Sequence, residues 1–226
     1  MSSVCENFRR VRSEVDAAAA AAGRDGKDIL LLAVSKTFPV SEIRSLYDMG
    51  VRDFGENRIQ ELESKAAELP PDIVWHFIGS LQSNKIRKAV RLASVIHSVD
   101  NIPAVGRLDR IAEEEKKHVK FLLEVNVSGE ASKSGVSRQD FMPLAHAAAR
   151  CRNAVFSGLM TMAPLDASSE VLDAVFGGLA ALRDQAEKEL GVALPLLSMG
   201  MSGDYGNAVA HGSTIVRIGT AVFGRR

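Results

Sequence analysis

Short apolar runs alternate eight times with longer amphipathic segments along this chain, and this alternation constrains the fold more than any other feature. Each run is apolar on both faces, as expected for the strands of a parallel sheet covered by helices. The runs predict strands at residues 29–34, 51–54, 74–78, 94–99, 121–125, 154–160, 195–199 and 214–218. The remaining amphipathic segments predict helices at residues 4–22, 40–49, 58–69, 85–92, 102–117, 138–150, 168–190 and 205–211.

Eight strand–helix units favour an α/β fold in which one (β/α)8 barrel of the TIM type closes, over an open doubly wound sheet. The extra N-terminal helix at residues 4–22 is expected to replace the helix missing after the last strand. No G-x-G-x-x-G motif follows the first strand, so a dinucleotide-binding sheet has no support. Residues 128–137 are the least regular connection, but they are too short for a linker, and residues 1–226 are expected to form a single domain.

Composition argues against several classes of function. The chain has 28 Lys and Arg against 28 Asp and Glu, which gives no electrostatic support for a nucleic-acid or anionic-membrane partner. No apolar stretch is long enough to span a bilayer, and residues 1–10 do not resemble a signal peptide. Cys5 and Cys151 indicate no disulfide framework, and the 5 histidines have no metal-ligand spacing. We therefore expect a cytoplasmic protein without a metal site.

Lys36 is the most informative single residue. It ends the first predicted strand with the same parity as Leu32 and Val34, so it should face the barrel interior at the carboxyl ends of the strands, where barrels of this type carry their sites. A lysine amine partly withdrawn from water is suited to forming an imine with an aldehyde. The alternative is a solvated lysine at a strand end.

Two glycine-containing loops, at residues 198–204 and 219–221, follow the last two strands. Phosphate commonly binds at this position in such barrels, although the glycines are also compatible with simple tight turns. Arg217 lies within the apolar final strand, where a buried arginine is costly unless it is paired. Its partner is either a carboxylate inside the barrel or a heteroatom of a ligand.

Seven ordered segments spanning almost the whole chain carry a family resemblance. They are LAVSKT (32–37), FGENRIQE (54–61), WHFIG (75–79), LQSNK (81–85), GLM (158–160), LSMGMS (197–202) and GSTIVRIGTAVFG (212–224). The sequence resembles the pyridoxal phosphate homeostasis proteins, which share the N-terminal barrel fold of alanine racemase. The resemblance implies pyridoxal 5′-phosphate (PLP) as cofactor and PLP fold type III without the β domain of racemases.

The resemblance also implies roles for particular residues. Lys36 is expected to form the Schiff base with PLP, and Asn57 to lie beside the cofactor. Arg217 is expected to face the pyridine nitrogen, where a cation keeps that nitrogen unprotonated and weakens PLP as an electron sink. The implied phosphate contacts come from Ser202, Gly219 and Thr220. The sequence departs from many relatives at Ser80, Gly203 and Gly206, and the two glycines bear on phosphate affinity.

The leading functional hypothesis is a PLP-binding protein that buffers the cofactor or delivers it to PLP-dependent apoenzymes, as a monomer and without strong catalysis of its own. The first alternative is a PLP-dependent enzyme similar to amino-acid racemases. Such an enzyme needs an acid opposite Lys36, for which Tyr205 and Cys5 are poorly placed, and the end at Arg226 leaves no room for a β domain. The second alternative is a phosphosugar enzyme with an aldolase-type Schiff base on Lys36.

Overall fold

A closed barrel of eight parallel strands forms the centre of the computed structural model, which describes residues 3–130 and 133–224. The strands pair in the order β4-β3-β2-β1-β9-β8-β7-β5, and a β4–β5 pairing closes the ring. Their bounds are β1 Leu30–Val34, β2 Asp53–Glu56, β3 Val74–Phe77, β4 Val95–Val99, β5 Lys120–Asn126, β7 Val155–Met160, β8 Leu196–Ser198 and β9 Ile215–Ile218. The predicted barrel is confirmed.

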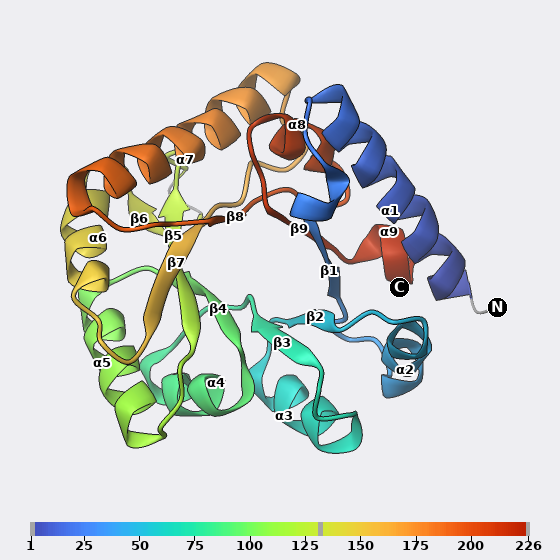
Figure 1. Ribbon diagram of the computed structural model, residues 1–226, viewed down its shortest axis with the longest axis horizontal. Helices are drawn as coiled ribbons and strands as arrows, with labels where there is room; N and C mark the ends of the chain where they lie inside the picture. The colour runs from blue at the N-terminus through green and yellow to red at the C-terminus, as the bar shows by residue number, and fades with distance from the viewer. Residues whose placement is uncertain (1–2, 131–132, 225–226) are drawn as a thin grey trace.

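Helices surround this barrel on the outside, as Figure 1 shows. Their bounds are α1 Ser3–Ala21, α2 Val40–Asp48, α3 Ile59–Glu68, α4 Ile86–Leu92, α5 Ile102–Glu114, α6 Phe141–Ala149, α7 Ser169–Leu190, α8 Tyr205–Ala210 and α9 Thr220–Phe223, with 3-10 turns η1 Gly26–Asp28 and η2 Ser83–Lys85. Helix α1 packs beside α8 and α9, so it closes the helical ring where the predicted pattern lacked a helix. None of the helices in the described residues is both long and apolar enough to cross a bilayer.

Besides the two 3-10 turns, the structure adds one short strand and one short helix to the predicted pattern. Strand β6, Val136–Ser137, lies in the loop predicted to be irregular and pairs with the end of β5. Helix α9 directly follows the last strand, where the sequence predicted a phosphate-binding turn. The predicted helix at residues 102–117 ends earlier, because Lys116 adopts a left-handed conformation with φ 52°. Strand β6 and helix α9 are too short to produce a periodic pattern of apolar residues in the sequence.

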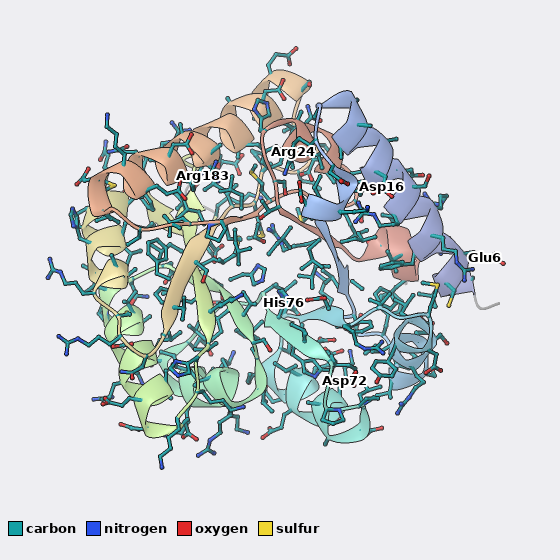
Figure 2. All side chains as sticks on the ribbon, viewed as in Figure 1. Glu6, Asp16, Arg24, Asp72, His76 and Arg183 are labelled. Carbon is teal, nitrogen blue, oxygen red and sulfur yellow. The ribbon has the colours of Figure 1, made fainter. Side chains whose placement is uncertain are left out.

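Apolar side chains fill two separate regions. The larger core lies between the sheet and the helices, and includes Phe54, Phe121 and Phe176. A small second cluster consists of the buried residues Val95, Leu122 and Met160, with Met162 and Leu196 packed against it. Alternation along the strands places this second cluster inside the barrel. Several polar side chains lie buried in the barrel as well, among them His76, which Figure 2 shows near its centre.

Candidate functional site

A pocket of about 780 Å³ opens at the carboxyl ends of the strands, a size suited to a small cofactor. Six residues that the sequence singled out all line it: Lys36, Asn57, Ser202, Arg217, Gly219 and Thr220. Apolar side chains complete the wall, including Val34, Phe38 and Ile78. The shared position of Val34 and Lys36 agrees with their equal strand parity. The barrel therefore gathers at one mouth residues that are up to 184 positions apart, from Lys36 to Thr220.

The backbone on both sides of Lys36 is held by charged side chains of α3. The Lys65 ammonium donates to the carbonyl oxygen of Ser35 at 2.8 Å and pairs with Glu61 at 2.7 Å. The Glu61 carboxylate in turn accepts a hydrogen bond from the backbone N–H of Thr37. Thr37 itself has φ 69°, which is an uncommon conformation for a residue other than glycine. The ion pair thus fixes the turn that presents Lys36 to the pocket.

A second carboxylate completes this cluster beneath the turn. Glu56 is fully buried, and its Oε1 accepts from Lys65 at 2.7 Å and from the Ser35 hydroxyl at 2.6 Å. Burial raises the pKa of Glu56, while the hydrogen bonds from Lys65 and Ser35 act to lower it. Sequence reasoning treated residues 58–69 as an ordinary amphipathic helix. The i,i+4 spacing of Glu61 and Lys65 was the available signal, but the buried partner on β2 could not be seen.

Asn57 has a buried acceptor without a partner. Its side-chain Oδ1 is inaccessible to solvent and makes no hydrogen bond with the described residues. Gly79 lies directly against the backbone of Asn57, because a Cβ on Gly79 would come within 1.9 Å of the Asn57 carbonyl oxygen. Buried polar atoms in folded proteins are almost always paired. An unpaired acceptor that belongs to a pocket-lining residue therefore fits a ligand that donates a hydrogen bond there.

The loops after β8 and β9 meet at one side of the pocket. The Ser202 hydroxyl accepts a hydrogen bond from the Ala221 N–H at 3.3 Å, which joins the two loops. Gly200 has φ 95°, and a Cβ there would lie 2.7 Å from the Cβ of Ala208, so the first loop needs glycine. Asp204 also lines the pocket, and burial raises the pKa of its carboxyl group. Two loops with backbone N–H groups beside the pocket are suited to an anion.

Arg217 is 95% buried at the inner end of the pocket (5% exposed). Its guanidinium donates to the Ser198 hydroxyl at 2.7 Å and to the Thr161 carbonyl oxygen at 2.9 Å. Burial lowers its pKa to about 10, so it stays charged at neutral pH. Among the described residues no carboxylate lies within ion-pair distance of it, so the carboxylate partner that the sequence left open is not found there. Two neutral groups therefore anchor the cation at the lining of the pocket.

The three residues expected to depart from the family pattern, Ser80, Gly203 and Gly206, differ in their place relative to the pocket. Ser80 and Gly203 lie on the pocket lining, whereas Gly206 does not. A Cβ added at Gly203 or Gly206 would meet nothing within 4 Å. Tyr205 and Cys5, the weak candidates for a racemase acid, lie outside the lining, and the Tyr205 hydroxyl donates to Glu14 on α1.

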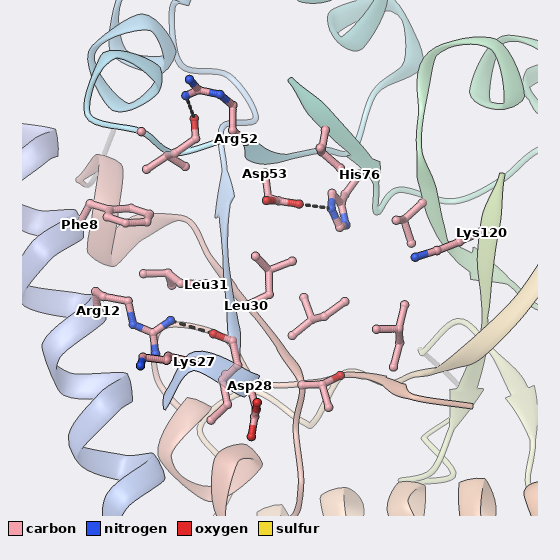
Figure 3. A pocket seen from close by; sticks show the side chains of 18 of the residues that line it. Phe8, Arg12, Lys27, Asp28, Leu30, Leu31, Arg52, Asp53, His76 and Lys120 are labelled. Atoms are coloured by element: carbon pink, nitrogen blue, oxygen red, sulfur yellow. Dashed lines mark hydrogen bonds and ion pairs between the residues drawn. The ribbon is translucent and has the colours of Figure 1, made fainter. Parts of the chain in front are cut away.

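A second pocket, of about 880 Å³, opens at the opposite end of the barrel, among the amino ends of the strands. Its lining includes Arg12, Lys27, Asp53, His76 and Lys120. Figure 3 shows the Asp53 carboxylate directed at the His76 ring, and a hydrogen bond of 3.1 Å joins Asp53 Oδ1 to His76 Nε2. Nothing in the sequence predicts this pocket, because the residues at the strand starts form no motif. Within residues 3–130 and 133–224, no group of His, Cys, Asp or Glu is arranged to hold a metal ion.

Comparison with known proteins adds independent findings. The family described as alanine racemase, N-terminal domain, matches residues 7–226. A pyridoxal phosphate homeostasis protein of Pseudomonas aeruginosa is 42% identical over 100% of this chain and 97% of its own length.

Solved structures agree with this match. PipY of Synechococcus elongatus PCC7942, solved without PLP, is 37% identical and superposes with a TM-score of 0.90 over 98% of this chain and 100% of PipY. PipY with PLP bound is 36% identical, with a TM-score of 0.87 over the same shares. Alanine racemase of Corynebacterium glutamicum shares only the fold, with 17% identity and a TM-score of 0.71 over 99% of this chain and 61% of the racemase chain. The chain therefore belongs to the pyridoxal phosphate homeostasis protein family.

Proposed function

We propose that this protein binds PLP as a Schiff base on Lys36 and acts in PLP homeostasis, by buffering the cofactor or delivering it, without strong catalysis of its own. One observation carries the proposal: a single pocket combines Lys36, two anion-binding loops and a buried arginine. Relatives named pyridoxal phosphate homeostasis protein and the PLP-bound structure of PipY support it.

Each lining residue has a proposed role. Lys36 supplies the amine, on a turn that Lys65 and Glu61 hold in place. Asn57 offers its unpaired Oδ1 to a donor on the cofactor. The proposed phosphate contacts are Ser202, Gly219 and Thr220, where the two loops meet. Arg217, on the lining of the same pocket, would hold the pyridine nitrogen.

Arg217 also favours carriage over catalysis. PLP, when bound, supplies an aldehyde and an electron sink, and the sink is strong only when the pyridine nitrogen is protonated. A guanidinium that stays charged at neutral pH opposes that protonation. The proposed partners are PLP-dependent apoenzymes, and the proposed state is a cytoplasmic monomer.

The test is a titration of the purified protein with PLP, followed by visible absorbance, in wild type, Lys36→Ala and Lys120→Ala. Lys120 is a matched control, because it lies at the opposite pocket. We expect a Schiff-base band in wild type and Lys120→Ala that is absent in Lys36→Ala. Borohydride reduction followed by peptide mass spectrometry should place the adduct on Lys36.

Two outcomes would contradict the proposal. A band that persists in Lys36→Ala would show that another lysine forms the Schiff base. No band in any variant, together with trapping of a sugar phosphate on Lys36, would favour the aldolase-type alternative.

A further inference from the structure

Four consecutive hydrogen bonds run through the inside of the barrel from one pocket to the other. Arg217 Nη1 lies 2.7 Å from Ser198 Oγ, which lies 2.9 Å from His97 Nδ1. His97 Nε2 lies 2.9 Å from His76 Nδ1, and His76 Nε2 lies 3.1 Å from an oxygen of Asp53. The residues come from five strands, β9, β8, β4, β3 and β2. Arg217 belongs to the pocket of Lys36, whereas His76 and Asp53 belong to the opposite pocket.

When every donor is paired within this chain of bonds, the chemistry of the groups allows one direction for each hydrogen bond. A guanidinium only donates, so Ser198 accepts from Arg217, and its own proton is left for His97 Nδ1. His97 then carries its proton on Nε2 and donates to His76 Nδ1. His76 in turn carries its proton on Nε2 and donates to the Asp53 carboxylate. Both imidazoles are therefore neutral Nε2–H tautomers, and all four bonds point from the cation to the carboxylate.

The surroundings favour this arrangement. His97 is fully buried, and burial, with the neighbouring His76 and Arg217, holds its pKa well below 6.5. Protonation of His97 would direct a second N–H at Ser198 and leave the serine proton without an acceptor. Glu124 and Asp204 also attract Arg217, but neither is within ion-pair distance. Asp53 is thus the carboxylate that hydrogen bonds link to Arg217, through the Ser198 hydroxyl and the two imidazole rings.

We propose that Ser198, His97 and His76 are positioning residues, which hold the Arg217 guanidinium against the cofactor pocket and couple it to Asp53 at the opposite mouth of the barrel. The part of this proposal that concerns PLP rests on the proposed function. Hydrogen bonds in such chains polarise one another, so removing the charge at one end weakens the last bond at the other. The barrel interior also contains an apolar cluster of Val95, Leu122 and Met160. Apolar side chains could therefore fill this interior in place of the polar ones. Fully satisfied polar networks of this kind fix geometry.

The first test uses the protein without PLP. Long-range 1H–15N correlation spectra of the imidazoles should show His76 and His97 as Nε2–H tautomers. Ser198→Ala removes the donor to His97 and should change the His97 nitrogen shifts. Ser213→Ala is the matched control, because this fully buried serine donates to the Met199 carbonyl outside the chain of bonds. Nδ1–H tautomers in wild type, or equal shifts in both variants, would overturn the proposed order of donors.

The second test changes a residue of the opposite pocket and measures the absorbance and binding of PLP. Asp53→Asn keeps an acceptor for His76 but removes the charge. It should shift the absorbance maximum of bound PLP and weaken PLP binding several-fold, while Ser198→Ala should weaken it about tenfold. Asp28→Asn is the matched control, since Asp28 lines the same pocket and stands outside the chain. A merely structural role would lower stability and leave the absorbance maximum unchanged.

The two proposals fail in distinguishable ways. A Lys36-dependent band that is identical in wild type, Asp53→Asn and Ser198→Ala overturns the coupling and leaves the proposed function standing. No band in any of them overturns the proposed function and the cofactor side of the coupling, while the tautomer spectra still decide the order of donors.

Discussion

At the scale of single residues, the reactive lysine depends on a second lysine that never reaches the pocket. Lys65 is 5% exposed and satisfies Glu56, Glu61 and the Ser35 carbonyl at once. Because Glu56 is fully buried, Lys65 is its compensating charge. Stability and the placement of Lys36 are therefore linked through one ammonium group.

Lys65→Met should lower the free energy of unfolding by about 3–5 kcal/mol, because it leaves the Glu56 carboxylate buried without a counter-charge. Urea denaturation measures this loss. The control is Lys88→Met, which breaks a pair with Glu63 that is about half exposed on both sides and should cost less than about 1 kcal/mol. Adding Glu56→Gln to Lys65→Met should recover part of the loss. Equal effects of the two single substitutions would contradict this account.

At the scale of elements, the pocket depends on how closely the loops after β2 and β3 approach. Gly79 has no room for a side chain against the Asn57 carbonyl oxygen, whereas Gly203, on the lining of the same pocket, has open space around it. The two glycines of the pocket, Gly79 and Gly203, therefore differ in the steric constraint on a side chain. Only the first is required by packing.

Gly79→Ala should lower the free energy of unfolding by about 1–3 kcal/mol, because a Cβ would overlap the backbone of the neighbouring loop. It should also displace Asn57 and weaken PLP binding. Gly203→Ala is the matched control and should change neither quantity appreciably. Thermal unfolding and the PLP titration measure the two effects, and a fully stable Gly79→Ala would show that the loops can separate.

Elements also show what the sequence could and could not predict. Strand periodicity predicted the eight barrel strands and the direction of Lys36, because alternation depends only on neighbours along the chain. The bonds from Asp53 to Arg217 depend on register among five strands, so no pattern in the sequence singles out His76 and His97. Asn57 was predicted from the family resemblance, but its unpaired oxygen was visible only in the structure.

At the scale of the whole molecule, the interior of the barrel makes stability depend on pH. Glu124 is 4% exposed, and burial, with repulsion from Asp100 and against attraction by Arg217, raises its pKa to about 7. The folded state therefore keeps a proton that the unfolded chain, with an ordinary pKa of 4.5, has already released. Between these two values the stability falls as pH rises.

Glu124→Gln should remove this dependence. Its free energy of unfolding relative to wild type should rise between pH 4.5 and pH 7, by roughly 3 kcal/mol in total, and stay constant above pH 7. Urea denaturation of both proteins at pH 5 and pH 8 measures the difference. His97 contributes in the opposite direction, with stability falling as pH drops below 6.5, but equally in both proteins. A constant difference at the two pH values would contradict the assignment to Glu124.

The contact between the first helix and the last ones affects how the protein is made. Asn7 and Arg10 donate to the carbonyl oxygens of Val222 and Ala221, and the rest of that face of α1 packs on α8 and α9. During translation this face leaves the ribosome well before its partners α8 and α9, which lie far along the chain. Closing the ring therefore waits for nearly the whole chain, and the long separation between contacting segments slows folding. Until α8 and α9 emerge, the apolar residues of α1 that are buried in the folded state lack these partners, and such surfaces are prone to aggregation.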